Sequence, residues 1–163
     1  MKVCPISSRT ADTVRILFVC SGNTCRSPMA EAIVRRLASE AARSDIEVSS
    51  AGTQAWDGSP ASDGALLVGM ERGLDLSAHR SRQLTREILM ESDLILAMTP
   101  SHLSRVRELN PEANAHLLAG FSAGESTGEA VQDPFGGDLA AYRETADDLE
   151  RELSGLLERI PSQ

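Results

Sequence analysis

Short apolar runs alternate with longer amphipathic segments along the chain of 163 residues. The run at residues 14–19, Val-Arg-Ile-Leu-Phe-Val, is rich in β-forming side chains, which is typical of a strand buried on both faces of a parallel sheet. Similar runs predict strands at residues 46–50, 93–98 and 115–119. Because helical segments separate these strands, the pattern predicts an α/β fold with a parallel sheet and right-handed crossovers.

A hydroxyl side chain followed by proline marks three expected helix starts. We expect Ser27 to cap a helix whose first residue is Pro28, since the apolar positions that follow have helical spacing. The same pair at residues 59–60 and 99–100 predicts two further helices. The residues 85–90 predict a short helix capped by the threonine that begins them.

Three further segments have distinct compositions, one at the N-terminus and two in the C-terminal part of the chain. Residues 1–13 are polar and predict a flexible extension outside a single domain at residues 14–163. Residues 120–138 are rich in Gly, Ser and Glu and predict a long loop, which in a compact domain is usually functional or mobile. Residues 139–160 carry one apolar stripe and predict a long amphipathic helix.

Charge and hydrophobicity argue against a nucleic-acid-binding, a membrane-spanning and a secreted protein. The chain has 16 basic and 24 acidic residues, a formal net charge of -8, which argues against a nucleic-acid-binding protein. No run approaches the roughly 18 apolar residues of a membrane span, and the N-terminus lacks the apolar stretch of a secretory signal. We therefore expect a cytoplasmic protein without a membrane partner. The oligomeric state is left open, with a monomer favoured.

The cysteines do not indicate a disulfide scaffold or a metal site. Their number is odd, Cys4, Cys20 and Cys25, and no secretory signal accompanies them. Two cysteines separated by four residues, with no second Cys/His cluster, make a poor zinc site. In a reducing compartment such cysteines are catalytic, redox-active or simply buried.

The strongest chemical signal is Cys20-x5-Arg26-Ser27, placed between a predicted strand and a predicted helix. Gly22 and Asn23 tolerate positive φ, so the loop can curl and turn its backbone amides inward as an anion site. Arg26 can offer a bidentate guanidinium to an oxyanion. Cys20 lies at the helix N-terminus, where a lowered thiol pKa is expected. The alternative is a buried structural cysteine beside a surface arginine.

Two motifs in this sequence resemble those of the low-molecular-weight protein tyrosine phosphatases. Residues 19–31, Val-Cys-Ser-Gly-Asn-Thr-Cys-Arg-Ser-Pro-Met-Ala-Glu, resemble the family's active-site signature, and residues 133–136, Asp-Pro-Phe-Gly, resemble its general-acid loop. The resemblance covers about residues 14–160. It implies a three-layer fold with a four-stranded parallel sheet flanked by helices, and phosphomonoester hydrolysis through a phosphocysteine. It also implies that no metal or cofactor takes part.

The resemblance assigns roles to individual residues. Cys20 matches the nucleophile, Arg26 the oxyanion clamp and Asp133 the general acid. Ser27 is placed to donate a hydrogen bond to the thiolate, and His79 resembles a histidine that supports the phosphate loop, which we define as residues 20–27. The remaining loop residues are expected to bind substrate through their amides, and they are Ser21, Gly22, Asn23, Thr24 and Cys25.

Further implications of the resemblance concern regulation and the cleft. Cys20 and Cys25 could form a reversible disulfide on oxidation, or Cys25 could simply be a buried loop residue. Asn23 is expected to hold a left-handed conformation through side-chain hydrogen bonds. Trp56 either contacts substrate or covers a loop. Pro134 should restrict Asp133 to an extended conformation that helps to aim its carboxylate.

The resemblance implies that the substrate is a phosphorylated protein, and two features favour phosphoarginine. Thr24 stands where tyrosine-specific relatives often have a bulky aliphatic residue, and Phe135 is the sole aromatic residue directly after Asp133-Pro134. Both features resemble the bacterial protein-arginine phosphatase branch of the family. A protein tyrosine phosphatase is the main alternative. An arsenate reductase ranks lower because no further cysteine follows Cys25. A redox-sensing, oxyanion-binding module also ranks lower because it needs no general acid.

Overall fold

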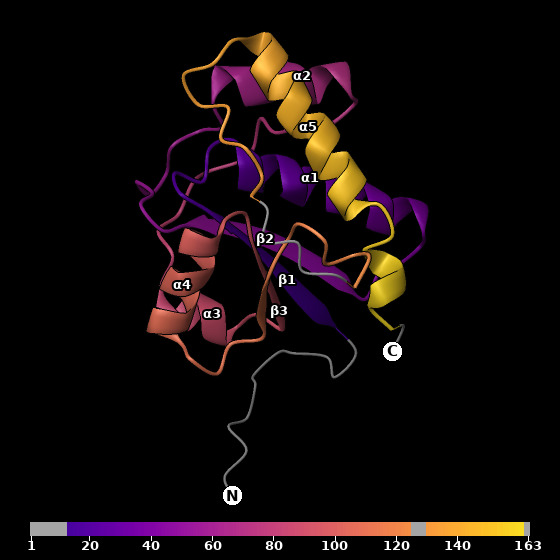
Figure 1. Ribbon diagram of the computed structural model, residues 1–163. Helices are drawn as coiled ribbons and strands as arrows, with labels where there is room; N and C mark the ends of the chain where they lie inside the picture. The colour runs from indigo at the N-terminus through magenta and orange to yellow at the C-terminus, as the bar shows by residue number, and fades with distance from the viewer. Residues whose placement is uncertain (1–12, 125–129, 162–163) are drawn as a thin grey trace, which may run out of the picture.

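The computed structural model describes residues 13–124 and 130–161. A central sheet lies between two layers of helices (Figure 1), which confirms the predicted α/β class with four parallel strands. In chain order the elements are β1 (Val14–Cys20), α1 (Arg26–Glu40), β2 (Ile46–Gly52), α2 (Asp63–Glu71), α3 (Arg86–Met90), β3 (Leu94–Ala97), α4 (Pro100–Leu109), β4 (Ala115–Leu117), α5 (Leu139–Leu153) and the 3-10 helix η1 (Leu157–Arg159).

From Ile16 onward strand β1 is buried on both faces, as its largely apolar run predicts. Ile16 and Phe18 belong to the core cluster that includes residues of α1, α2 and α5. Leu17 and Val19 alternate with them and belong to the second cluster, under α3 and α4. Cys20 continues the first alternation, so its side chain is directed toward the α1 layer.

The strand order β2-β1-β3-β4 sets the position of the site. The chain passes from β1 through α1 to β2 on one side, and β3 then pairs with the other side of β1. In open parallel sheets a crevice opens where neighbouring strands lead away in opposite directions. The phosphate loop leaves β1 at this crevice, facing the N-terminal end of α4.

Two of the helix starts differ from the sequence prediction. Helix α1 begins at Arg26 rather than Pro28, and the Cys25 position before it has no side-chain cap. The Ser27 hydroxyl instead contacts Cys20 and Asn23, so it is turned away from a capping position. The pair at residues 59–60 starts no helix, since α2 begins after Ser62, which accepts a hydrogen bond from the amide of residue 65.

The other helix starts are confirmed. Thr85 caps α3 by accepting from the amide of residue 88, and Thr99 caps α4 by accepting from that of His102. The predicted helix at residues 139–160 is wrong in its length. Helix α5 ends at Leu153, Gly155 follows with a φ of 83°, and η1 carries the apolar stripe onward against the core.

The predicted loop at residues 120–138 holds no helix or strand in its described residues. The extension at residues 1–13, with Cys4, lies outside the described part of the chain except for its last residue. Across the described ranges, no helix has both the length and the apolar character needed to cross a membrane.

Gly52, the last residue of β2, allows the phosphate loop to approach the sheet. A Cβ added there would overlap the carbonyl oxygen of Ser21 and lie 3.0 Å from the amide nitrogen of Asn23. We expect Gly52→Ala to lower the free energy of unfolding by roughly 1–3 kcal/mol, because backbone must shift to make room. Urea denaturation measures this value. Ser49→Ala in the same strand is the control, and equal stability of the two variants would contradict the prediction.

Candidate active site

A pocket of about 330 Å³ opens at the carboxyl end of β1. It brings together the phosphate loop and the Asp133–Phe135 segment, which are far apart in the sequence. Its lining residues are Cys20, Ser21, Gly22, Asn23, Thr24, Cys25, Arg26, Gln54, Trp56, Ser59, Asp133 and Phe135. Of the residues singled out from the sequence, Ser27 and His79 do not line the pocket. Ser27, the last residue of the loop, and His79, behind the loop, both contact Asn23 instead.

The backbone carbonyls of the phosphate loop are bound by donors from outside the loop. This arrangement turns the opposite edge of the peptide units, with their N–H groups, toward the pocket. The loop carbonyls and their donors are Cys20 O with Thr53 N at 2.9 Å, Ser21 O with Gln54 N at 2.9 Å, Asn23 O with His79 Nε2 at 2.6 Å and Thr24 O with Ser62 N at 2.9 Å. In the described part of the chain, the amides of Gly22, Thr24 and Cys25 donate to no other group of the protein. The loop therefore presents backbone N–H groups in the arrangement that suits an anion.

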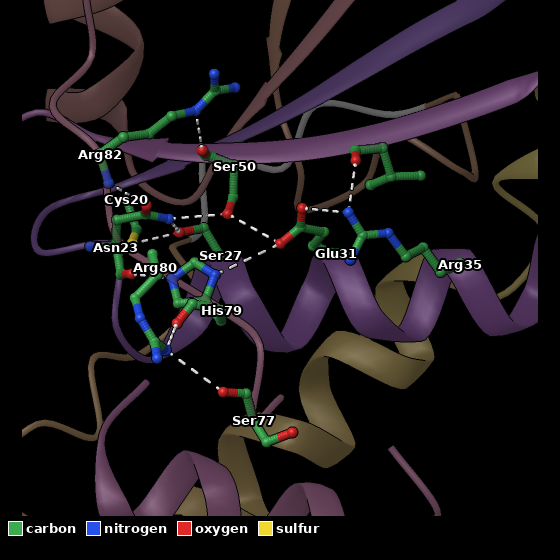
Figure 2. Close-up of polar contacts among 11 residues, drawn as sticks. Cys20, Asn23, Ser27, Glu31, Arg35, Ser50, Ser77, His79, Arg80 and Arg82 are labelled. Carbon is green, nitrogen blue, oxygen red and sulfur yellow. Dashed lines mark hydrogen bonds and ion pairs between the residues drawn. The ribbon is translucent and has the colours of Figure 1, made fainter. Parts of the chain in front are cut away.

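Asn23 fixes the curl of the loop. It is fully buried and has a φ of 58°, the left-handed conformation expected from the sequence. Its side-chain amide donates to the hydroxyls of Ser27 at 2.8 Å and Ser50 at 2.9 Å, and its side-chain oxygen accepts from the backbone amide of Arg82 at 2.9 Å (Figure 2). Three hydrogen bonds thus offset the cost of an unusual backbone conformation.

A second set of groups supports the loop from behind (Figure 2). The His79 Nε2–H donates to the carbonyl of Asn23, so the tautomer with a proton on Nε2 is required. The other ring nitrogen lies 3.7 Å from a carboxylate oxygen of Glu31, which also accepts from the Ser50 hydroxyl at 3.2 Å. The hydrogen bond expected from His79 to the loop is therefore present.

The sulfur of Cys20 is almost completely buried. It lies 2.8 Å from the Ser27 hydroxyl oxygen and accepts from the Asn23 amide at 3.3 Å. Because the Asn23 side chain already donates to that hydroxyl, the proton of Ser27 is free to point at the sulfur.

Burial raises the pKa of the Cys20 thiol, so the lowered pKa expected from the sequence is wrong for this structure. Desolvation is the largest effect on this pKa, because it penalises the charged thiolate. The Ser27 hydroxyl, the amides of Ser27 and Asn23, and the Arg26 charge act in the opposite direction. These hydrogen bonds and this charge favour the thiolate form of Cys20, which is the nucleophilic form.

Arg26 and Asp133 lie side by side at the pocket. Arg26 is the first residue of α1 and is only 4% exposed. One of its guanidinium nitrogens donates to the Val131 carbonyl at 3.1 Å, and another lies 3.5 Å from the Asp133 carboxylate. The Asp133 side chain is 50% exposed and accepts from the Phe135 amide at 3.1 Å. A carboxylate in this position faces the mouth of the anion site.

Cys20 and Cys25 are both free thiols. The Cys25 sulfur lies 3.1 Å from the Ser62 hydroxyl and 3.6 Å from the Tyr142 hydroxyl. The side chain of Cys25 is therefore held by Ser62, the residue that precedes α2, and by Tyr142 of α5, and both Cys25 and Thr24 line the pocket.

Several residues that contact the loop were not predicted from the sequence. Besides the backbone donors to the loop carbonyls, Ser50 and Arg82 bind Asn23, and His102 lies 2.8 Å from the Ser21 hydroxyl. Local spacing gave no signal for Ser50 or Arg82. His102 could have been found, because the Thr99-Pro100 start signal places it in the first helical turn after a buried strand, at the sheet edge that carries the site.

The sequence of this chain is similar to those of known phosphatases over almost its whole length. The family described as low molecular weight phosphotyrosine protein phosphatase matches residues 15–163. A protein-arginine-phosphatase from Geobacillus stearothermophilus is 41% identical over 151 residues, covering 91% of this chain and 97% of the relative. A probable low molecular weight protein-tyrosine-phosphatase, EpsP, from Ralstonia nicotianae is 34% identical, covering 89% of this chain and 94% of the relative.

A solved structure shares the whole fold. The YwlE arginine phosphatase, in a mutant form with a phosphorylated active-site serine, superposes with a TM-score of 0.84 at 34% identity. The match covers 90% of this chain and 95% of that chain. The protein is thus a cysteine-dependent phosphatase, and it belongs to the low molecular weight phosphotyrosine protein phosphatase family.

Proposed function

We propose that this phosphatase hydrolyses phosphoarginine in proteins. The observation that carries the proposal is the position of Thr24, which lines the pocket between Asn23 and Cys25 of the phosphate loop. The Thr24 hydroxyl lies 3.7 Å from the Cys25 sulfur, so it stands at this wall of the pocket. A hydroxyl at this wall can hydrogen-bond to a guanidinium, whereas a phenol ring is better matched by a hydrocarbon. A site built around such a hydrogen bond disfavours a substrate that leaves it unpaired.

Two further observations support phosphoarginine. Phe135 supplies one aromatic face near Asp133, and the half-exposed Asp133 carboxylate can attract the cationic guanidinium as well as transfer a proton. The protein-arginine-phosphatase from Geobacillus stearothermophilus also aligns over almost its full length.

In the first proposed step Cys20 attacks phosphorus as the thiolate, while Asp133 is protonated. The sulfur forms a bond to phosphorus while the P–N bond to arginine breaks, and Asp133 gives its proton to the departing guanidino nitrogen. The loop amides and the Arg26 guanidinium stabilise the charge on the phosphoryl oxygens. The products of this step are arginine and a phosphocysteine.

In the second proposed step water replaces the sulfur. The Asp133 carboxylate takes a proton from water as the oxygen attacks phosphorus, and the S–P bond breaks to release inorganic phosphate. Cys20 leaves as a thiolate that accepts the Ser27 hydrogen bond. The net reaction consumes one water and returns the enzyme to its starting state.

The tyrosine phosphatase alternative has one observation in its favour. Trp56 and Phe135 both line the pocket, and they are 84% and 74% exposed. Exposed aromatic faces at a pocket rim can stack on a phenol ring. Substrate preference therefore has to be measured on both substrates.

Ser27→Ala tests the activation of Cys20. The variant lacks the hydroxyl that lowers the pKa of the thiol, so that pKa should rise further and the ascending limb of kcat/KM should move to higher pH. Near pH 7 the activity should fall roughly 10-fold or more, because a hydrogen bond to a charged group is lost. Ser50→Ala is the matched control, since it removes another partner of Asn23 without touching the sulfur. An unshifted profile in Ser27→Ala would exclude this role.

Asp133→Asn tests the general acid. Hydrolysis of phosphoarginine should slow by roughly 10²–10⁴-fold, because the guanidine needs a proton to leave. The defect in the first step should be much smaller with 4-nitrophenyl phosphate, whose phenolate leaves without one. Burst kinetics separate this step from hydrolysis of the phosphocysteine. Asp147→Asn, at an exposed aspartate paired with Arg72, is the control. An equal first-step defect with both substrates would indicate positioning instead.

Thr24→Ile tests the substrate. The change keeps the β-branch, deletes the hydroxyl and adds apolar bulk, so kcat/KM should fall on phosphoarginine and rise on phosphotyrosine. The ratio of the two values should change roughly 100-fold or more. Thr24→Ser, which keeps the hydroxyl, should retain the preference for phosphoarginine. A wild type that prefers phosphotyrosine would instead support the tyrosine phosphatase alternative.

A further inference from the structure

His102 is a buried polar residue that the mechanism above does not use. It lies in the first turn of α4 and is 4% exposed. Its Nε2 atom is 2.8 Å from the hydroxyl of Ser21, and its Nδ1 atom is 3.0 Å from the hydroxyl of Thr99. The Thr99 hydroxyl also accepts from the His102 backbone amide, so the ring and the helix start are fixed by one side chain.

The contact with Ser21 crosses the crevice between β1 and β3. Ser21 follows the nucleophile directly on the β1 side, and Thr99 and His102 stand at the end of β3. The partners of Asn23 from outside the loop are Ser50, His79 and Arg82, and none of them belongs to α4. His102 therefore provides a side-chain anchor for the loop from the α4 side.

The imidazole acts here without a charge. Burial and the nearby Arg26 charge lower the pKa of His102 to about 4, against a smaller opposing effect of Asp133. At neutral pH the ring is thus a neutral hydrogen-bonding partner, which neither repels Arg26 nor draws the Asp133 carboxylate away from the pocket.

We propose that His102 is a positioning residue for the phosphate loop. By holding the Ser21 side chain, it fixes the two peptide units that flank Ser21 and keeps their amides directed at the phosphoryl oxygens. The inference rests on the phosphatase activity, and it holds for either amino-acid substrate. Loop amides that are slightly misdirected should lower transition-state binding more than ground-state binding, because charge on the phosphoryl oxygens is redistributed during transfer.

The test compares two substitutions at position 102. His102→Leu removes both ring hydrogen bonds, whereas His102→Gln keeps an amide group near the place of Nε2. With 4-nitrophenyl phosphate, His102→Leu should lower kcat roughly 10- to 100-fold with little change in KM. It should weaken inhibition by vanadate, which mimics the transition state, more than inhibition by inorganic phosphate. His102→Gln should recover most of the loss. His116→Leu, at an exposed histidine of β4, is the matched control and should behave as wild type.

A double-mutant cycle identifies the partner. Ser21→Ala alone should reproduce the kcat defect, and Ser21→Ala combined with His102→Leu should be no worse than either single change. Circular dichroism and thermal unfolding confirm that each variant is folded at the assay temperature. Folded His102→Leu with normal kcat and vanadate inhibition would overturn the inference, and so would additive defects in the cycle. A wild type inactive on every phosphorylated substrate would instead contradict the phosphatase activity itself.

Discussion

The structure depends on one constraint, which is that the phosphate loop must turn its N–H groups inward. A buried peptide carbonyl left without a donor is costly, so each carbonyl turned outward needs a partner elsewhere. Thr53 and Gln54 after β2, Ser62 before α2 and His79 in the following loop supply these partners. The segment between β2 and α3, which includes α2, therefore stabilises the phosphate loop by supplying hydrogen-bond donors to its carbonyls.

The burial that makes the site effective also opposes the charge on its nucleophile. A dry pocket strengthens hydrogen bonds to a phosphoryl group, but it raises the pKa of Cys20. The Ser27 hydroxyl is therefore turned toward the sulfur, and helix α1 begins without a side-chain cap. Helix α1 therefore lacks the stabilisation of a side-chain cap, and the Cys20 thiolate has the Ser27 hydroxyl as a hydrogen-bond donor.

Sequence patterns predicted the parts of the molecule that depend on neighbouring residues. The largely apolar run identified β1, and Thr85 and Thr99 identified two helix starts through local capping. Prediction failed where two signals compete. The Ser27 hydroxyl contacts the Cys20 sulfur seven residues away instead of capping α1. Gly155 is a local signal that ends α5, but the apolar stripe that continues beyond it favoured a longer helix. Contacts such as that of His102 with Ser21 join segments that no local spacing connects.

The side chains of the loop divide its tasks residue by residue. Those of Ser21, Asn23 and Cys25 are each held by groups outside the loop, and Gly22 has none to offer. Thr24 lines the pocket between two such anchored residues. In the proposed mechanism the loop amides act on the phosphoryl group and Thr24 faces the amino acid that departs. On that mechanism a substitution of Thr24 changes the specificity for the amino acid and leaves in place the hydrogen bonds of Ser21, Asn23 and Cys25 that shape the loop.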